Sequence, residues 1–225
     1  MKKAKMLSLT AGLVLAITFT LSCSSDDGDE GGGGGSSSSG GGGGSSSSSQ
    51  CSNAGSGTFT DDRDGQTYRY VTICSTWMAE NLNYNASGSR CFNDLEDNCD
   101  TYGRLYDWTT ANNACPSGWH LASRAEWRAL QNLVGGKEIA GTKLKATSGW
   151  GRYGGTDDYG FSALPGGHYN SQYGYLDIGD RGDWWGAYGS SASFTYGYSI
   201  TNGYGLNEST LSAIGLYYSV RCIKD

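Results

Sequence analysis

Residues 115–127 read Cys-Pro-Ser-Gly-Trp-His-Leu-Ala-Ser-Arg-Ala-Glu-Trp, and this stretch decides how the fold is interpreted. Ser123 and Glu126 have the spacing of a capping box, in which each side chain accepts a hydrogen bond from the other residue's backbone N–H. Apolar residues then recur at helical spacing from Trp127 to Val134, and two glycines at 135 and 136 end the pattern. The sequence therefore predicts a helix that begins after Ser123 and stops at these glycines.

The segments on either side of this helix predict a mixed fold. A second helix is expected from about Asp107 to Ala114, ahead of Pro116. Upstream, the polar turn at 61–66 separates two β-like runs and predicts a hairpin. Two main helices, short antiparallel strands and long loops make an α+β domain. Further strands are expected in the Gly-punctuated segments 183–188, 193–200, 204–211 and 216–223.

Six cysteines follow residue 50, and an even number in an exported domain predicts up to three disulfides. The predicted hairpin brings its two ends together, and an acidic loop at 93–98 is flanked by a second pair of cysteines. The last pair is then assigned by elimination. No spacing is CxxC, which disfavours zinc or redox chemistry. The expected disulfides are Cys51–Cys74, Cys91–Cys99 and Cys115–Cys222.

The first 50 residues are predicted to export and tether the domain. Residues 1–22 combine early lysines with an apolar run, as a secretory signal peptide does. They lead into Cys23 through a sequence that resembles a bacterial lipobox; an ordinary signal peptide with an incidental cysteine is the alternative. Residues 23–50 read as a disordered acidic and Gly/Ser linker with a reach of about 30 Å. We expect an outer-membrane lipoprotein that faces the cell surface, anchored by acyl chains on Cys23, with residues 51–225 as its domain.

Charge and composition exclude several classes of function. A net charge of −6 without a basic patch argues against nucleic-acid binding. Only two histidines occur: His120 is expected to be buried and structural, and His168 is expected in a loop that could be exposed. Neither has a nucleophile or a second base at a recognisable spacing. The sequence therefore predicts no catalytic residue and no cofactor.

One acidic loop is a weak candidate for calcium. Carboxylates crowd the segment between Cys91 and Cys99, and oxygen ligands gathered in a loop can hold calcium. Their spacing matches neither an EF-hand nor the Glu-Pro-Asn motif of lectins, so a solvated acidic loop is the favoured interpretation. The weak candidates are Asp94, Glu96, Asp97 and Asp100.

The segment from Tyr159 to Tyr218 is rich in aromatic residues interleaved with Gly, Ser, Asn and Asp. Strand alternation sends neighbouring residues to opposite faces, so only one residue of the pair Trp184/Trp185 should be exposed. Exposed Tyr and Trp in such a mixture are typical of recognition surfaces, and their rings can stack on sugars. The ligand-binding candidates are Tyr169, Tyr173, Tyr175, Trp184, Trp185, Tyr188, Tyr196 and Tyr198.

Six short sequence motifs, each occurring once and in this order along residues 58–225, carry a family resemblance. They are Asp64-Gly65-Gln66-Thr67-Tyr68, Trp77-Met78-Ala79-Glu80-Asn81-Leu82-Asn83-Tyr84, Tyr102-Gly103-Arg104-Leu105-Tyr106, Cys115-Pro116-Ser117-Gly118-Trp119-His120-Leu121 with Glu126-Trp127, Gly160-Phe161-Ser162-Ala163-Leu164-Pro165-Gly166-Gly167, and Tyr218-Ser219-Val220-Arg221-Cys222-Ile223-Lys224-Asp225. In this order they resemble the Fibrobacter succinogenes major paralogous domain.

That family is similar in turn to the formylglycine-generating-enzyme and C-type-lectin-like group. The resemblance implies a C-type-lectin-like fold in which the terminal strands pair, and a surface lipoprotein; it implies no activity. Oxidases of the group hold copper with two neighbouring cysteines near the C-terminus, whereas Cys222 stands alone here.

The expected function is that of a surface-anchored, non-catalytic binding module for a polysaccharide or another surface ligand. The alternatives are a structural envelope lipoprotein without a specific ligand and a diversified receptor for protein ligands. An oxidase is the least expected, and the oligomeric state stays open.

Overall fold

The helix predicted after Ser123 is α3 (Arg124–Leu133) in the computed structural model, which describes residues 55–187, 195–203 and 205–225. Both hydrogen bonds of the capping box are present: Ser123 Oγ accepts from the Glu126 backbone, and Glu126 Oε2 accepts from the Ser123 backbone at 2.7 Å. The helix buries Trp127 and Leu130. The capping box thus sets the start of α3, and its apolar face holds it against the core.

The second main helix lies elsewhere than predicted. The segment after Asp107 forms a single turn, α2 (Trp108–Ala111), because the asparagines that follow it favour turns. The longer helix is α4 (Lys137–Leu144), which starts directly after Gly135 and Gly136. Both glycines have φ near +100°, so they reverse the chain into a new helix. The sequence also did not reveal η1 (Phe92–Asp94) and α1 (Glu96–Tyr102).

The described strands form three sheets in which neighbouring strands are antiparallel. The first sheet holds, in order, β1 (Ser56–Thr60), β2 (Thr67–Ile73), β3 (Ser75–Met78), β13 (Cys222–Lys224) and β6 (Trp119–Leu121). The second holds β11 (Leu206–Leu211), β10 (Thr195–Thr201) and β9 (Arg181–Gly186). The third holds β4 (Ser89–Arg90), β5 (Leu105–Asp107), β12 (Leu216–Tyr218), β7 (His168–Asn170) and β8 (Gly174–Leu176).

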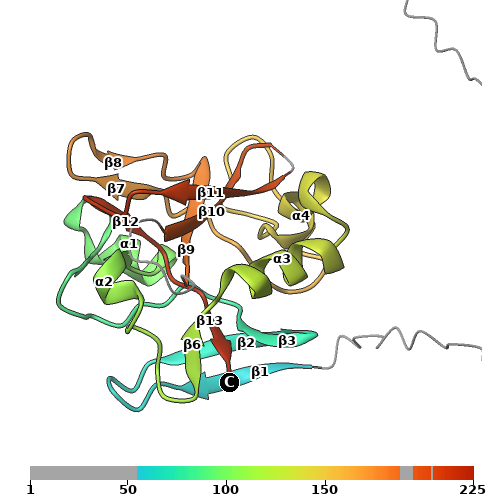
Figure 1. Cartoon of the computed structure of the whole chain (residues 1–225), viewed down its shortest axis with the longest axis horizontal. Coiled ribbons are helices and arrows are strands. Elements are labelled where there is room, and N and C mark those ends of the chain that lie inside the picture. Colours follow the sequence, from blue (N-terminus) through green and yellow to red (C-terminus); the bar gives the residue numbers. More distant parts are fainter. Residues whose placement is uncertain (1–54, 188–194, 204) are drawn as a thin grey trace, which may run out of the picture. The chain divides into compact units, whose positions relative to one another are not determined.

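The predicted hairpin is confirmed, with Phe59 opposite Tyr68 in the register of β1 and β2. The strand predicted at 216–223 is wrong in one respect, because it is split between two sheets. β12 belongs to the third sheet and β13 to the first, and the chain crosses between them at Ser219–Arg221. In Figure 1, α3 and α4 lie on one side of the domain and the β7–β8 hairpin on the other. The α+β prediction is confirmed by this mixture of helices and antiparallel sheets.

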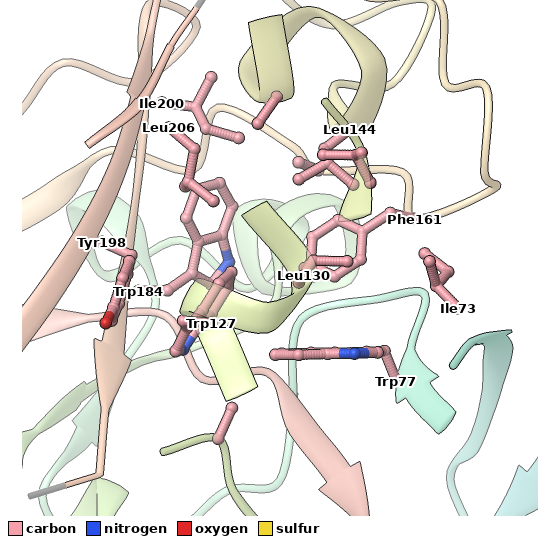
Figure 2. Close-up of a cluster of buried hydrophobic side chains, with 14 of the residues drawn as sticks. Ile73, Trp77, Trp127, Leu130, Leu144, Phe161, Trp184, Tyr198, Ile200 and Leu206 are labelled. Atoms are coloured by element: carbon pink, nitrogen blue, oxygen red, sulfur yellow. The ribbon is translucent and has the colours of Figure 1, made fainter. Parts of the chain in front are cut away.

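Two hydrophobic clusters form the core, and Trp127 lies at the centre of the first. Its ring lies 4.8 Å from the ring of Tyr198 and 5.0 Å from that of Trp77, measured between centroids. Figure 2 shows Trp127 beside Tyr198 and Trp184, with Trp77 and Phe161 further along the same layer. The second cluster gathers Trp185, Tyr106 and Tyr218 among other side chains.

The prediction that one of Trp184 and Trp185 is exposed is wrong, since both side chains are 0% exposed. Strand alternation does separate them, but each face of β9 meets a different cluster: Trp184 enters the first and Trp185 the second. Their indole N–H groups donate to Asn81 Oδ1 and to the Tyr106 carbonyl. Tyr198 is also buried, at 1% exposure. These three candidates are core residues and form no ligand surface.

A buried arginine forms hydrogen bonds with residues from several of the motifs quoted above. The Arg221 side chain is fully buried and donates to Asn81 Oδ1 at 2.7 Å and to three backbone carbonyls. Those carbonyls belong to Met78, Phe161 and Ser162. Asn81 in turn donates to the Tyr102 carbonyl. The motifs around residues 78, 102, 161 and 221 are therefore parts of one buried hydrogen-bond network.

Two of the predicted disulfides are present, Cys91–Cys99 and Cys115–Cys222. Cys74 is also disulfide-bonded. Its predicted partner Cys51 and the acylation site Cys23 lie outside the described residues. The disulfide between Cys115 and Cys222 ties the segment before β6 to the start of β13.

Glu208 links β11 to helix α3. Its carboxylate accepts hydrogen bonds from Arg124, Arg128 and the Tyr198 hydroxyl. Burial alone would raise the pKa of Glu208, but these three donors outweigh it and lower the pKa from its ordinary 4.5 to about 2. Because the pKa is lower in the folded state, this contribution to stability is present above pH 4.5 and is lost as the pH falls toward 2.

Glu208→Gln is therefore expected to lower the free energy of unfolding at pH 7 by about 1–2 kcal/mol, since both arginines are partly exposed and solvent screens the pairs. Urea unfolding at pH 7 and at stepped values between pH 4.5 and 2 measures this difference. The difference should shrink across that interval. A matched control is Glu80→Gln, which removes the exposed pair with Arg69 and should cost less than about 0.5 kcal/mol. A difference that stays constant across the interval would contradict the assignment to Glu208.

Candidate functional site

Three tyrosines stand side by side on neighbouring strands of the third sheet. Tyr217 of β12 lies opposite Tyr169 of β7, and Tyr169 lies opposite Tyr175 of β8. Residues directly opposite one another in antiparallel strands point to the same face. The ring centroid of Tyr169 lies 5.3 Å from that of Tyr217 and 4.8 Å from that of Tyr175. We call these three half-buried residues the tyrosine ladder.

The guanidinium of Arg90 lies over this ladder. Its Cζ atom is 3.9 Å from the ring centroid of Tyr169, 4.4 Å from that of Tyr217 and 6.0 Å from that of Tyr175. Arg90 reaches this position from β4, since Arg90 lies opposite Leu105 of β5 and the ladder begins on the next strand. Such contacts are favourable cation–π interactions. Arg90 could not be predicted from the sequence, because its contacts depend on strands far apart in the chain.

The loop closed by Cys91–Cys99 contacts the ladder at its Tyr175 end. The Phe92 ring lies 5.1 Å from that of Tyr175, and the Tyr175 hydroxyl donates a hydrogen bond to Asp94 Oδ1. Burial, followed by this hydrogen bond, raises the pKa of Tyr175 to about 12. The hydroxyl therefore stays protonated at neutral pH and keeps donating to Asp94.

Two exposed apolar side chains lie at the loop tips beside the ladder. Tyr173, in the turn between β7 and β8, is 66% exposed, and Ile214, in the turn before β12, is 90% exposed. The two turns are joined by a hydrogen bond of 2.8 Å from the Ser171 N–H to the Gly215 carbonyl. We call Tyr173 and Ile214 the loop-tip pair. Exposed apolar groups next to an aromatic surface are a common mark of an interaction site.

The structure brings together three of the eight predicted ligand-binding residues, Tyr169, Tyr173 and Tyr175. Tyr196 lies in the second sheet, half-buried, with the Arg124 guanidinium 4.3 Å from its ring centroid. Tyr188 lies outside the described residues. Tyr217 belongs to the site and was not predicted, although its place in the predicted segment 216–223 could have suggested it.

The acidic loop does not assemble a calcium site from its candidates. Asp94 accepts from Tyr175, and Glu96 lies 3.5 Å from Arg104. Within residues 55–187, 195–203 and 205–225, the grouping with metal-ligand spacing is Cys91, Glu96 and Cys99. The two sulfur atoms of that group are bonded to each other, so they are unavailable as thiolate ligands. Asp97 and Asp100 are exposed on α1.

Both histidines differ from expectation. His120 is not buried: its side chain is 42% exposed, and its ring nitrogens contact Asp225 and Glu126. Burial alone would lower the pKa of His120, but these two carboxylates raise it. His168 lies in β7 rather than in a loop, with its side chain 12% exposed and Nδ1 3.1 Å from Asp183 Oδ2. Arg181 also holds Asp183 through two nitrogens, so this carboxylate is already engaged in an ion pair with Arg181.

A groove of about 630 Å³ runs along β1, β2 and the 157–162 loop. Two of its charged side chains are already engaged: Arg69 pairs with Glu80, and Asp157 accepts two hydrogen bonds from Ser162. The tyrosine ladder, by contrast, combines aromatic faces, a guanidinium and exposed apolar tips. It is therefore the stronger candidate for ligand binding.

The structure is that of a disulfide-stapled α+β domain with the tyrosine ladder on its third sheet. Residues 71–224 match the family described as the Fibrobacter succinogenes major domain, so the chain belongs to that family. No curated protein and no solved structure matches the chain. In the described part of the chain, no helix has the length and apolar character needed to cross a bilayer.

Proposed function

We propose that this protein is a lipid-anchored, non-catalytic binding module that recognises a polysaccharide or another surface ligand. The observation that carries the proposal is the tyrosine ladder, three aromatic rings in register on adjacent strands with the loop-tip pair beside them. Tyr and Ile offer large contact areas at low entropic cost, and flat rings stack on the apolar faces of sugars.

A C-type-lectin-like fold is part of this proposal. The expected pairing of the terminal strands is wrong, because β2 and β3 lie between β1 and β13 in the first sheet. What supports the proposal is that both terminal strands belong to this one sheet, and that a disulfide ties β13 to the segment before β6. An oxidase of the related group would need two free thiols near its C-terminus. All five described cysteines are disulfide-bonded, which favours binding over copper chemistry.

The membrane anchor rests on residues 1–50, whose lipobox-like Leu21-Ser22-Cys23 predicts acylation. We propose an outer-membrane lipoprotein that faces the cell surface. Mass spectrometry of the N-terminal peptide of the purified protein should show Cys23 as an acylated first residue. An unacylated peptide, or cleavage at another position, would overturn the anchor while leaving the ladder untouched.

Binding is tested by replacing the exposed tyrosine of the loop-tip pair. Tyr173→Ala is expected to weaken glycan binding by about 2 kcal/mol, because an anchor residue at an interface contributes on this scale. Its free energy of unfolding should change by less than about 0.5 kcal/mol, since its side chain is 66% exposed. Pull-down and titration of the full chain against a panel of soluble polysaccharides provide the measurement.

Tyr153→Ala is the matched control, since Tyr153 is 48% exposed and lies outside the loop tips and the ladder. It should bind as the unchanged protein does. Equal weakening by both substitutions would point to nonspecific adsorption. No binding to any polysaccharide would favour the structural envelope lipoprotein, and binding confined to proteins would favour the diversified receptor.

A further inference from the structure

Arg90 differs from the other arginines that the structure describes. It is half-buried, yet no described carboxylate lies within ion-pair distance of it, and its Nε is buried without a hydrogen-bond acceptor. A buried donor without an acceptor is unfavourable, because it has lost its hydrogen bonds to water. The other buried or half-buried arginines of the described residues, which are Arg104, Arg124, Arg181 and Arg221, all have carboxylate or carbonyl partners.

Arg90 is held in place by tyrosine side chains rather than by a carboxylate. Tyr169 and Tyr217 contact the guanidinium through their rings, at 3.9 and 4.4 Å from their centroids. A guanidinium donates in its own plane, as a fork that matches the two oxygens of a carboxylate. The Nε atom is buried without a hydrogen-bond acceptor, and the guanidinium also interacts with the Tyr175 side chain. Tyrosine side chains therefore fix the position of Arg90, and no described carboxylate pairs with its charge.

Among the described residues, the carboxylate that is hydrogen-bonded to the ladder is Asp94, at the Tyr175 end. Asp94 accepts a hydrogen bond from the hydroxyl of Tyr175. The ring centroid of Tyr175 lies 6.0 Å from Arg90 Cζ, further than the centroids of Tyr169 and Tyr217. No ion pair joins Asp94 to Arg90. The surface thus presents a cation over Tyr169 and Tyr217 and an acceptor beyond Tyr175.

We propose that the ligand of this surface is an acidic polysaccharide whose carboxylates pair with Arg90, as those of a uronic-acid chain would, while its sugar rings pack against the exposed loop-tip pair beside the ladder. This inference rests on the proposed function and names the chemical class of its ligand. The chain carries a net charge of −6, so long-range attraction cannot collect polyanions. Recognition must come from the local contact between the carboxylate and the guanidinium.

The test compares two forms of one polymer on the full chain purified in detergent. Polygalacturonate carries a carboxylate on every sugar, and its methyl ester keeps the ring and removes the charge. We expect the protein to bind the acid form at least about tenfold more tightly than the ester. Arg90→Gln should reduce this preference to within about twofold, and Arg90→Lys should keep part of it, because lysine retains charge without the planar fork. Arg152→Gln, at an exposed arginine, should leave the preference unchanged.

Each outcome separates this inference from the proposed function. Equal binding of acid and ester, or a preference that survives Arg90→Gln, would overturn the role of Arg90 while the binding module stands. Binding of dextran sulfate but not of polygalacturonate would overturn the assignment to carboxylates. Absence of binding to every charged and neutral polysaccharide would overturn the proposed function itself. Since the comparison of acid with ester needs no substitution, equal binding of the two forms overturns the proposal even if Arg90 variants fail to fold.

Discussion

Replacing Arg221 by methionine is expected to lower the free energy of unfolding by about 3–5 kcal/mol, because several buried acceptors lose their donor at a cost of about 1–3 kcal/mol each. Methionine fills much of the volume but donates no hydrogen bond. The substitution would leave Asn81 Oδ1 and the carbonyls of Met78, Phe161 and Ser162 without this donor. Buried acceptors without a donor are costly because water cannot replace the lost partner.

Lysine is not expected to replace Arg221, although it carries the same charge. Burial lowers the pKa of Arg221 to about 9, so the side chain remains a cation at neutral pH. Its partners are neutral oxygens spread around a planar fork, and Arg221→Lys should therefore recover only a minor part of the loss. Urea unfolding with the disulfides intact measures the free energy of unfolding of the original protein, of Arg221→Met and of Arg221→Lys. Arg69→Gln, at an exposed ion pair, serves as the surface control. An Arg221→Met protein as stable as the original would show that the desolvation of the cation cancels its hydrogen bonds.

Removal of the Cys115–Cys222 disulfide by a double alanine substitution should cost about 4–5 kcal/mol, as expected for a cross-link that closes a long loop in the unfolded chain. The two cysteines are 107 residues apart in the sequence. The pair Cys91–Cys99, separated by 8 residues, provides a matched comparison within the same protein. Its removal should cost about 2–3 kcal/mol by the same chain-entropy relation.

Peptide mapping under non-reducing conditions first establishes the pairing, and urea unfolding of the two double-alanine variants then compares the losses. A larger loss for the short loop would contradict the entropic explanation. Detection of Cys115 linked to Cys91 or Cys74 would contradict the pairing on which the comparison depends.

Local signals in the sequence were sufficient where neighbouring residues determine the structure. The capping box of Ser123 and Glu126 located the start of α3, and the polar turn at 61–66 located the first hairpin. The strands β9, β10 and β11 also lie within three residues of their predicted bounds. In each case the alternation or the cap acts over a few residues, so the tertiary structure does not override it.

The predictions failed where the fold brings distant segments together. Alternation separated Trp184 from Trp185, but it could not show that hydrophobic clusters cover both faces of β9. Helix α4 was missed because its buried residues, Ala140, Gly141 and Leu144, are mostly small and give a weak amphipathic pattern. Arg90 was missed because the ladder beneath it is assembled from β7, β8 and β12, which follow it by about eighty residues or more.

The position of β13 between β3 and β6 dictates an order of events during biosynthesis. As Figure 1 shows, the red C-terminal strand lies within the sheet that also contains the blue β1. The ribosome synthesises residues 55–218 before it reaches β13, so β3 and β6 at that stage lack the strand that joins them. Asn81 at that stage lacks Arg221, and Cys115 lacks its thiol partner. The nascent chain thus cannot close this sheet early, and a chain exported as we propose would still be unfolded when it enters the translocation channel. Oxidation and folding would then follow on the far side of the inner membrane, where disulfides persist.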